Sequence, residues 1–174
     1  MLQLNHGKEL TIDGTAANSG ITSILQPQHG TKLTINGGTY ERINATSVRT
    51  LSLTNATFNN TTSNLAIGAT NCGDVTLTNC TVTSSENSAV NVRSSNSLTV
   101  TGGTFTCTST SSSYDAIYSS YTKNVSVWAQ LHLPRAAAQP IWVMLIRSPS
   151  PTAALSPPLL PCPQSMCLVL KMFL

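Results

Sequence analysis

An eight-residue phrase recurs along this chain, and it limits the possible folds more than any other feature of the sequence. Its clearest form, Leu-Thr-Val-Thr-Gly-Gly-Thr-Phe, occupies positions 98–105. The six copies, of which the outer two are weaker, begin at Leu10, Leu33, Leu51, Val75, Leu98 and Val125. These starts lie 23, 18, 24, 23 and 27 residues apart, a spacing typical of solenoid proteins. We therefore expect each copy to form the same structural unit.

Within each copy, apolar residues alternate with Thr, Ser or Asn, as in the run Leu-Thr-Ile-Asn at 33–36. This alternation predicts a half-buried strand. Each run ends in residues that are small or tolerate a left-handed backbone, namely Gly37-Gly38, Asn55-Ala56, Asn79-Cys80 and Gly102-Gly103. One copy is thus expected to comprise a strand, a bend and a short second strand.

A second apolar phrase precedes the copies by eight to ten residues, at Ile24, 65–67, 89–92 and 116–118. Three short strands per period cannot bury an apolar face alone, but they do so when they stack on neighbouring coils. The sequence therefore predicts an all-β fold, a parallel β-helix of about five coils. Its internal row is expected to contain Leu10, Leu33, Leu51, Val75 and Leu98. A β-sandwich is the competing fold, although it does not require the same residue type at the same phase of every period.

Composition indicates a location outside the cell. Charged residues make up 9% of the sequence, against about 25% in an average domain, and Thr, Ser and Asn dominate the repeats. Residues 1–20 lack the pattern of a signal peptide, so we expect the chain to begin within a repeat, as a fragment of a longer protein. The net charge of +3 comes from Arg135, Arg147 and Lys171, because acidic and basic residues balance before position 127. A nucleic-acid partner is therefore not expected.

The residue usage of the chain changes after position 126. Residues 128–174 contain no Gly, Asn, Asp or Glu but hold eight of the nine prolines and both tryptophans. We therefore divide the chain into a parallel β-helix fragment at 1–126 and a Pro-rich tail at 127–174 that is not a domain. The apolar runs 141–146 and 167–174 are shorter than the ~20 residues of a membrane span.

This tail is interpreted as the product of a shifted reading frame. Codons for the run at 148–152, read in another frame, are compatible with Val-Thr-Val-Thr-Asn, a phrase like that at 75–79. Codons for 164–167 are likewise compatible with Ala-Val-Asn-Val, the sequence at 89–92. A non-native tail without evolved structure is expected to be disordered or weakly structured. A genuine Pro-rich tail is the alternative.

Neither the histidines nor the cysteines form a predicted metal site. His6 and His29 stand before strands at the same phase of successive coils, but no third ligand shares that phase, so we interpret them as repeated turn residues. Cys72, Cys80 and Cys107 lack a CxxC pair and are expected to be small thiols that are buried or line turns. We predict no metal and no cofactor.

The repeats resemble the right-handed parallel β-helix repeats of the pectin lyase-like superfamily, over about residues 8–127. Within it they are most similar to the Thr/Asn/Gly-rich repeats of large bacterial surface and adhesin-like proteins. The resemblance implies a right-handed coil and a secreted or cell-surface location. It specifies no activity, because the superfamily includes polysaccharide lyases, glycosidases, phage tailspikes and non-catalytic stalks.

An enzyme of this superfamily would be expected to gather carboxylates on one face, for calcium binding or acid–base chemistry. Here the row of Asp13 carries one carboxylate in five coils, and Glu41, Asp74, Glu86 and Asp115 occupy unlike phases. We identify no catalytic residue. The leading hypothesis is a fragment of an extracellular structural or adhesive stalk that is not an enzyme. The alternative is a fragment of a pectin lyase-like carbohydrate-active enzyme whose active site lies outside these coils.

The polar positions of four copies suggest a further role as a binding surface. They are expected to form an outward polar ladder of Thr34, Asn36, Ser52, Thr54, Thr76, Thr78, Thr99 and Thr101. A flat lattice of this kind suits a glycan or ice, but the variation of the period from 18 to 27 residues predicts an irregular lattice. The partners that we expect are glycans and host or cell-surface proteins. Exposed coil ends are expected to pair with further coils or to self-associate.

Overall fold

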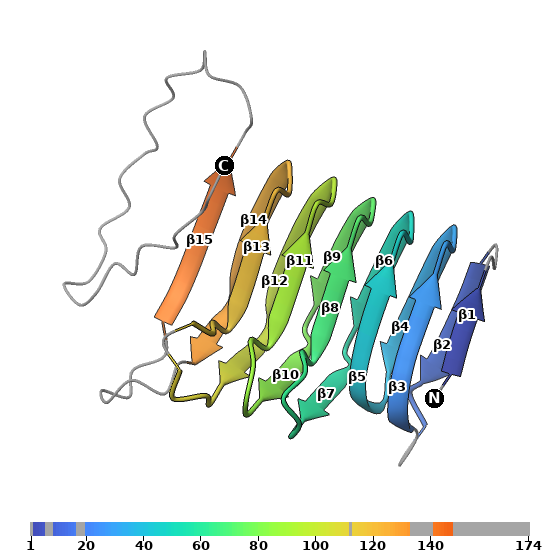
Figure 1. Cartoon of the computed structure of the whole chain (residues 1–174), viewed down its shortest axis with the longest axis horizontal. Helices are drawn as coiled ribbons and strands as arrows, with labels where there is room; N and C mark the ends of the chain where they lie inside the picture. Colours follow the sequence, from blue (N-terminus) through green and yellow to red (C-terminus); the bar gives the residue numbers. More distant parts are fainter. Residues whose placement is uncertain (1, 6–8, 17–19, 112, 133–140, 148–174) are drawn as a thin grey trace.

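The computed structural model describes residues 2–5, 9–16, 20–111, 113–132 and 141–147. Within these ranges the chain forms fifteen strands and no helix. The strands wind into a parallel β-solenoid of about five turns, whose coils follow one another along the long axis of Figure 1. Three faces, each a ladder of parallel strands, make up the walls of the solenoid.

The first face contains the strands of the repeated phrase. They are β2 (Glu9–Gly14), β4 (Lys32–Gly37), β6 (Thr50–Thr54), β9 (Asp74–Thr78), the start of β12 (Ser97–Cys107) and the start of β14 (Asn124–His132). The register pairs Leu10, Leu33, Leu51, Val75, Leu98 and Val125 in sequence order. This register confirms the predicted internal row and all five spacings.

The other two faces complete each turn. The second face contains the start of β3 (Gly20–Gln28), the start of β5 (Thr39–Thr46), β7 (Thr57–Asn60), β10 (Thr81–Ser84) and the ends of β12 and β14. The third face contains β1 (Leu2–Asn5), the ends of β3 and β5, β8 (Ile67–Thr70), β11 (Val90–Arg93) and β13 (Ile117–Ser120). Every pair in these ladders is parallel, which excludes the β-sandwich.

Like residues from successive coils fill the interior in columns. On the second face the column contains Tyr40, Phe58, Val82, Phe105 and Leu131, and on the third it contains Leu25, Ile43, Ile67, Val90 and Ile117. All of these side chains are buried. Burial of one such apolar side chain stabilises the fold by about 1.5–3 kcal/mol, so the stacked columns are the main source of stability.

The second apolar phrase contributes Leu25, the neighbour of Ile24, to the column of the third face. The sequence assigned Ile24 to the apolar phrase, but Leu25 occupies the column and pairs with Ile43, whereas Ile24 pairs with Arg42. Leu25 lies eight residues before Leu33, the same offset that separates each later column residue from the start of its first-face strand. Ile43 itself is a column member that the sequence analysis did not identify.

Left-handed residues turn the chain at two corners. The predicted bends after the first face are confirmed, because Gly37, Gly38, Gly102 and Gly103 have φ of 66–86° and Asn55 and Asn79 have φ of 53° and 49°. At Gly103 a Cβ atom would collide with the Cys80 carbonyl oxygen, so the corner requires glycine there.

The corner before the first face uses one left-handed residue per coil. These residues are His29, Ser47, Asn71, Ser94 and Tyr121, with φ between 51° and 54°. The first four donate their backbone N–H groups to carbonyl oxygens of the next coil at 3.0 Å. His29 is therefore a turn residue, as interpreted from the sequence, while His6 lies outside the described residues.

Variation in the repeat period arises mainly at the corner between the second and third faces. In the shortest coil, β5 passes from one face to the other without interruption. In later coils the segments 61–66, 85–89 and 108–116 are inserted at this point. The first face lies outside these insertions, so its register continues without a break.

The predicted boundary between repeats and tail falls within β14. This strand continues the parallel pairing with β12 as far as His132, and Val127, Ala129 and Leu131 are buried in the alternating pattern of earlier coils. Beyond it, β15 (Ile141–Arg147) pairs with β14 in the antiparallel direction. Residues 133–140 and 148–174 lie outside the described residues, and the frame shift stays a prediction.

Candidate functional site

The outward side of the first face places the predicted polar ladder in two adjacent rows. One row consists of Thr11, Thr34, Ser52, Thr76, Thr99 and Ser126, and the other of Asp13, Asn36, Thr54, Thr78, Thr101 and Trp128. All eight predicted ladder residues are therefore cross-strand neighbours. We call these two rows the outer ladder.

From β6 to β12 the outer ladder presents hydroxyl groups at regular intervals, whereas Asp13, Asn36 and Trp128 occupy the outer positions of one row. Neighbouring strands lie ~4.8 Å apart, and residues two positions apart on one strand are separated by ~6.6 Å. Seven of the predicted residues are half-buried and Thr101 is exposed, because each side chain is flanked by the coils on either side. The variation in period leaves the register of this face unbroken, since the additional residues of the longer coils lie at other corners.

Asp74 joins two coils at the entry to the first face. Its carboxylate accepts hydrogen bonds from Ser97 Oγ at 2.7 Å and Asn96 Nδ2 at 2.8 Å. These two bonds, with Ser97 the larger contributor, lower the pKa of the Asp74 carboxyl. Asp74 therefore has a structural role at the coil interface, and the two hydrogen bonds explain why a carboxylate stands at this position.

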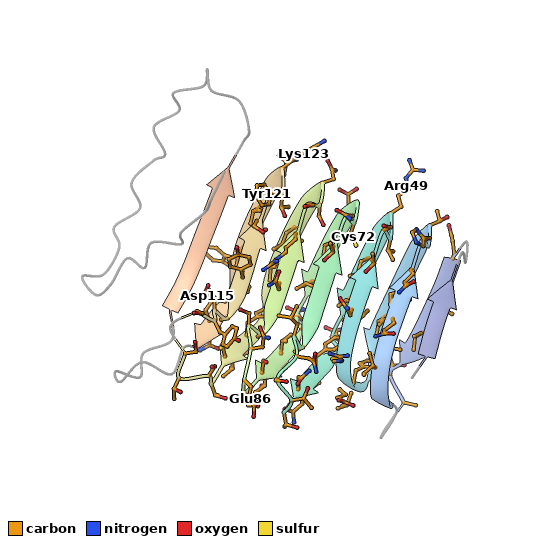
Figure 2. All side chains as sticks on the ribbon, viewed as in Figure 1. Arg49, Cys72, Glu86, Asp115, Tyr121 and Lys123 are labelled. Atoms are coloured by element: carbon orange, nitrogen blue, oxygen red, sulfur yellow. The ribbon has the colours of Figure 1, made fainter. Side chains whose placement is uncertain are left out.

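The described carboxylates do not assemble into a ligand set. Figure 2 places Glu86 and Asp115 at the edge formed by the loops, on the opposite side from Arg49 and Lys123. Within the described ranges no group of three His, Cys, Asp or Glu residues is close enough to hold a metal ion.

The three cysteines of the repeats are free and buried, as the sequence predicted. Cys80 Sγ donates to the Leu53 carbonyl oxygen at 3.4 Å, and Cys107 Sγ donates to the Asn87 carbonyl oxygen at 3.3 Å. Burial raises the pKa of each of these thiols and of the Cys72 thiol. Raised pKa values and burial make them packing residues rather than nucleophiles.

A groove on the third face was not identified from the sequence. Its volume is about 460 Å³, and it lies between the strands β8, β11 and β13 and the loops that precede them. Its lining includes Leu65, Asn91, Arg93, Tyr114 and Tyr118. No sequence pattern indicates this groove, because Asn91 and Tyr118 become neighbours only through the pairing of β11 with β13.

No protein family model, curated protein or solved structure matches this chain. In the part of the chain that the structure describes, no helix has the length and apolar character needed to cross a membrane. The geometry of the outer ladder and of the groove is therefore the basis for the functional argument.

Proposed function

We propose that the chain is a segment of an extracellular structural or adhesive stalk, without catalytic activity of its own, whose outer ladder contacts glycans. The observation that carries this proposal is the continuous register of polar, mostly hydroxyl-bearing residues from Thr34 to Thr101 along the first face. Hydroxyl groups donate and accept hydrogen bonds, which suits them to the hydroxyl groups of sugars. The low charge of the chain and the likeness of its repeats to those of bacterial surface proteins support the same proposal.

A stalk must maintain its shape along one axis, and the architecture is suited to that task. Each coil contacts its neighbours through three backbone ladders and three apolar columns, so length is added without a change in cross-section. Paired backbone groups and buried side chains also leave few segments open to proteases.

Binding to immobilised glycans tests the adhesive role. The variant Thr76→Lys places a long cation in the centre of the outer ladder and is expected to reduce binding at least tenfold. Its matched control is Thr83→Lys, which changes an equally half-buried threonine on the second face. Equal loss in both variants, or binding unchanged by Thr76→Lys, would contradict the proposal.

Two further assays address the remaining parts of the proposal. Antibody labelling of intact expressing cells is expected to detect the protein at the surface. Incubation with polysaccharides is expected to release no new reducing ends or unsaturated sugars. Release would favour the alternative, a fragment of a pectin lyase-like carbohydrate-active enzyme.

A second candidate function is the ordering of water at an ice surface. The unbroken register of the outer ladder favours it, because the strands from β6 to β12 repeat the same hydroxyl positions from coil to coil. A thermal-hysteresis measurement tests it, and a reading of zero would dismiss it.

A further inference from the structure

We propose that the groove on the third face binds a glycan that carries a single carboxylated sugar, with Arg93 as the residue that recognises the carboxylate. This site is separate from the outer ladder and does not depend on the glycan contact proposed above. The groove, at about 460 Å³, falls within the range of ~300–1,000 Å³ of small-molecule sites.

Hydrogen bonds between loops of successive coils hold the wall of the groove in place. Asn87 Nδ2 donates to the Ser63 carbonyl oxygen at 2.9 Å, and Asn87 Oδ1 accepts the Ser88 N–H at 2.8 Å. Ser88 Oγ in turn accepts the Asp115 N–H at 3.1 Å. Three loops are thus connected before any ligand arrives, which reduces the entropy lost on binding.

Arg93 is oriented but its charge is not neutralised. Its Nε donates to Asn91 Oδ1 at 3.1 Å, and its guanidinium carbon lies 5.5 Å from the centre of the Tyr118 ring. No carboxylate of the described residues forms an ion pair with it. These contacts fix the plane of the guanidinium and leave its two terminal amino groups available for a carboxylate, the arrangement in which arginine binds planar anions.

The other lining residues favour a sugar as the body of the ligand. Tyr114 and Tyr118 supply aromatic rings, while Asn91 and the neighbouring serines supply amide and hydroxyl groups. Amides and hydroxyls match the hydroxyl groups of a sugar, and aromatic rings pack against its C–H faces. Leu65 is the one aliphatic side chain in the lining, which makes an apolar ligand a poor match.

The ligand is expected to carry one carboxylate rather than many. Arg93 is the only charged residue in β8, β11 and β13, so the strands of the groove offer one cation. A polyanion would need a series of cations along its path to offset the repulsion and desolvation of its charges. A terminal acidic sugar fits the single guanidinium.

Calorimetric titration of the full chain with sialyllactose, its methyl ester and lactose tests this proposal. Sialyllactose is expected to bind at least about tenfold more tightly than the other two, because the loss of a charge-assisted hydrogen bond is worth about that factor. Arg93→Gln is expected to remove the difference between the ligands, and Arg93→Lys is expected to restore only part of it. The methyl ester tests the same contact without any change to the protein.

Arg49→Gln is the matched control, because it removes the same charge from an exposed arginine that does not line the groove. It is expected to leave sialyllactose binding unchanged. Arg93→Gln is in turn expected to leave the glycan binding that depends on Thr76 unchanged, so failure of this site is distinguishable from failure of the stalk function. Equal binding of lactose and sialyllactose would overturn the proposal. So would unchanged binding by Arg93→Gln, or equal binding of a sulfated lactose.

Discussion

The rings of Tyr40 and Phe58, which belong to successive coils, stack inside the solenoid with their centroids 5.3 Å apart and an angle of 26° between their planes. Both side chains are almost fully buried, and they continue the column that contains Val82 and Phe105. The contact therefore joins neighbouring turns through the interior, in addition to the backbone ladder at the wall.

Removal of one ring from this stack is expected to destabilise the protein strongly. Phe58→Ala should lower the free energy of unfolding by about 3–5 kcal/mol, because it removes buried apolar surface and leaves a cavity between two coils. Chemical denaturation monitored by circular dichroism measures the change. Asn59→Ala, at the exposed position next in sequence, is the control and should change stability by less than about 0.5 kcal/mol.

Replacement of Tyr121 by glycine is expected to stabilise the protein. Tyr121 has φ of 54° and a side chain that is 71% exposed, so it bears left-handed strain with little burial in return. Relief of this strain should add about 1 kcal/mol to the free energy of unfolding. The control is Tyr118→Gly, because Tyr118 lies in β13 without positive φ and glycine there should destabilise the strand. A loss of stability in both variants would contradict the argument.

Acidification is expected to weaken the coil interface at Asp74. Since its pKa is lower in the folded state, the folded protein binds fewer protons there than the unfolded chain does, and stability rises with pH. The contribution is fully present above the unfolded pKa of ~3.9 and is lost as the pH falls through the folded value. Melting temperatures from pH 7 to pH 2 should fall less for Asp74→Asn than for the unchanged protein. Glu86→Gln, which removes a loop carboxylate, should follow the unchanged protein.

The buried thiols are expected to resist modification until the protein unfolds. In a variant with Cys162→Ser and Cys167→Ser, the remaining three cysteines should not react with Ellman's reagent at pH 8, because they are buried and their pKa values are raised. All three should react in guanidinium chloride. The further substitution Thr108→Cys places a thiol at an exposed position. This thiol should react at once and serves as the positive control. Rapid reaction of the three thiols in the folded protein would contradict the prediction, because it would show that the interior of the solenoid opens readily to the reagent.

The first face was predictable from sequence because one residue type recurs at one phase of every copy. Leu33, Leu51 and Val75 differ in spacing along the chain, yet the phrase around each of them aligns without gaps. The glycine and asparagine bends were predictable for a chemical reason, since few other residues tolerate a left-handed backbone.

The third face was harder to predict because its strands are short and their phrases less alike. Ile24 and Leu25 are adjacent apolar residues, and the pairing of Leu25 with Ile43 identifies which of them occupies the column. The left-handed corner recurs four residues before each copy of the first-face phrase, but it uses four residue types between His29 and Tyr121, which hides its repetition. The groove could not be predicted from the sequence for a further reason, which is that Arg93 and Tyr118 become neighbours only when the coils stack.

The inserted segments at 61–66, 85–89 and 108–116 mark a position where the molecule tolerates changes in chain length. Because each segment leaves and returns to the same corner, a longer or shorter one need not alter the spacing of the strands on either side. This edge is therefore a natural grafting point for foreign peptides. A series of such grafts along it would display them side by side, at intervals set by the backbone ladder.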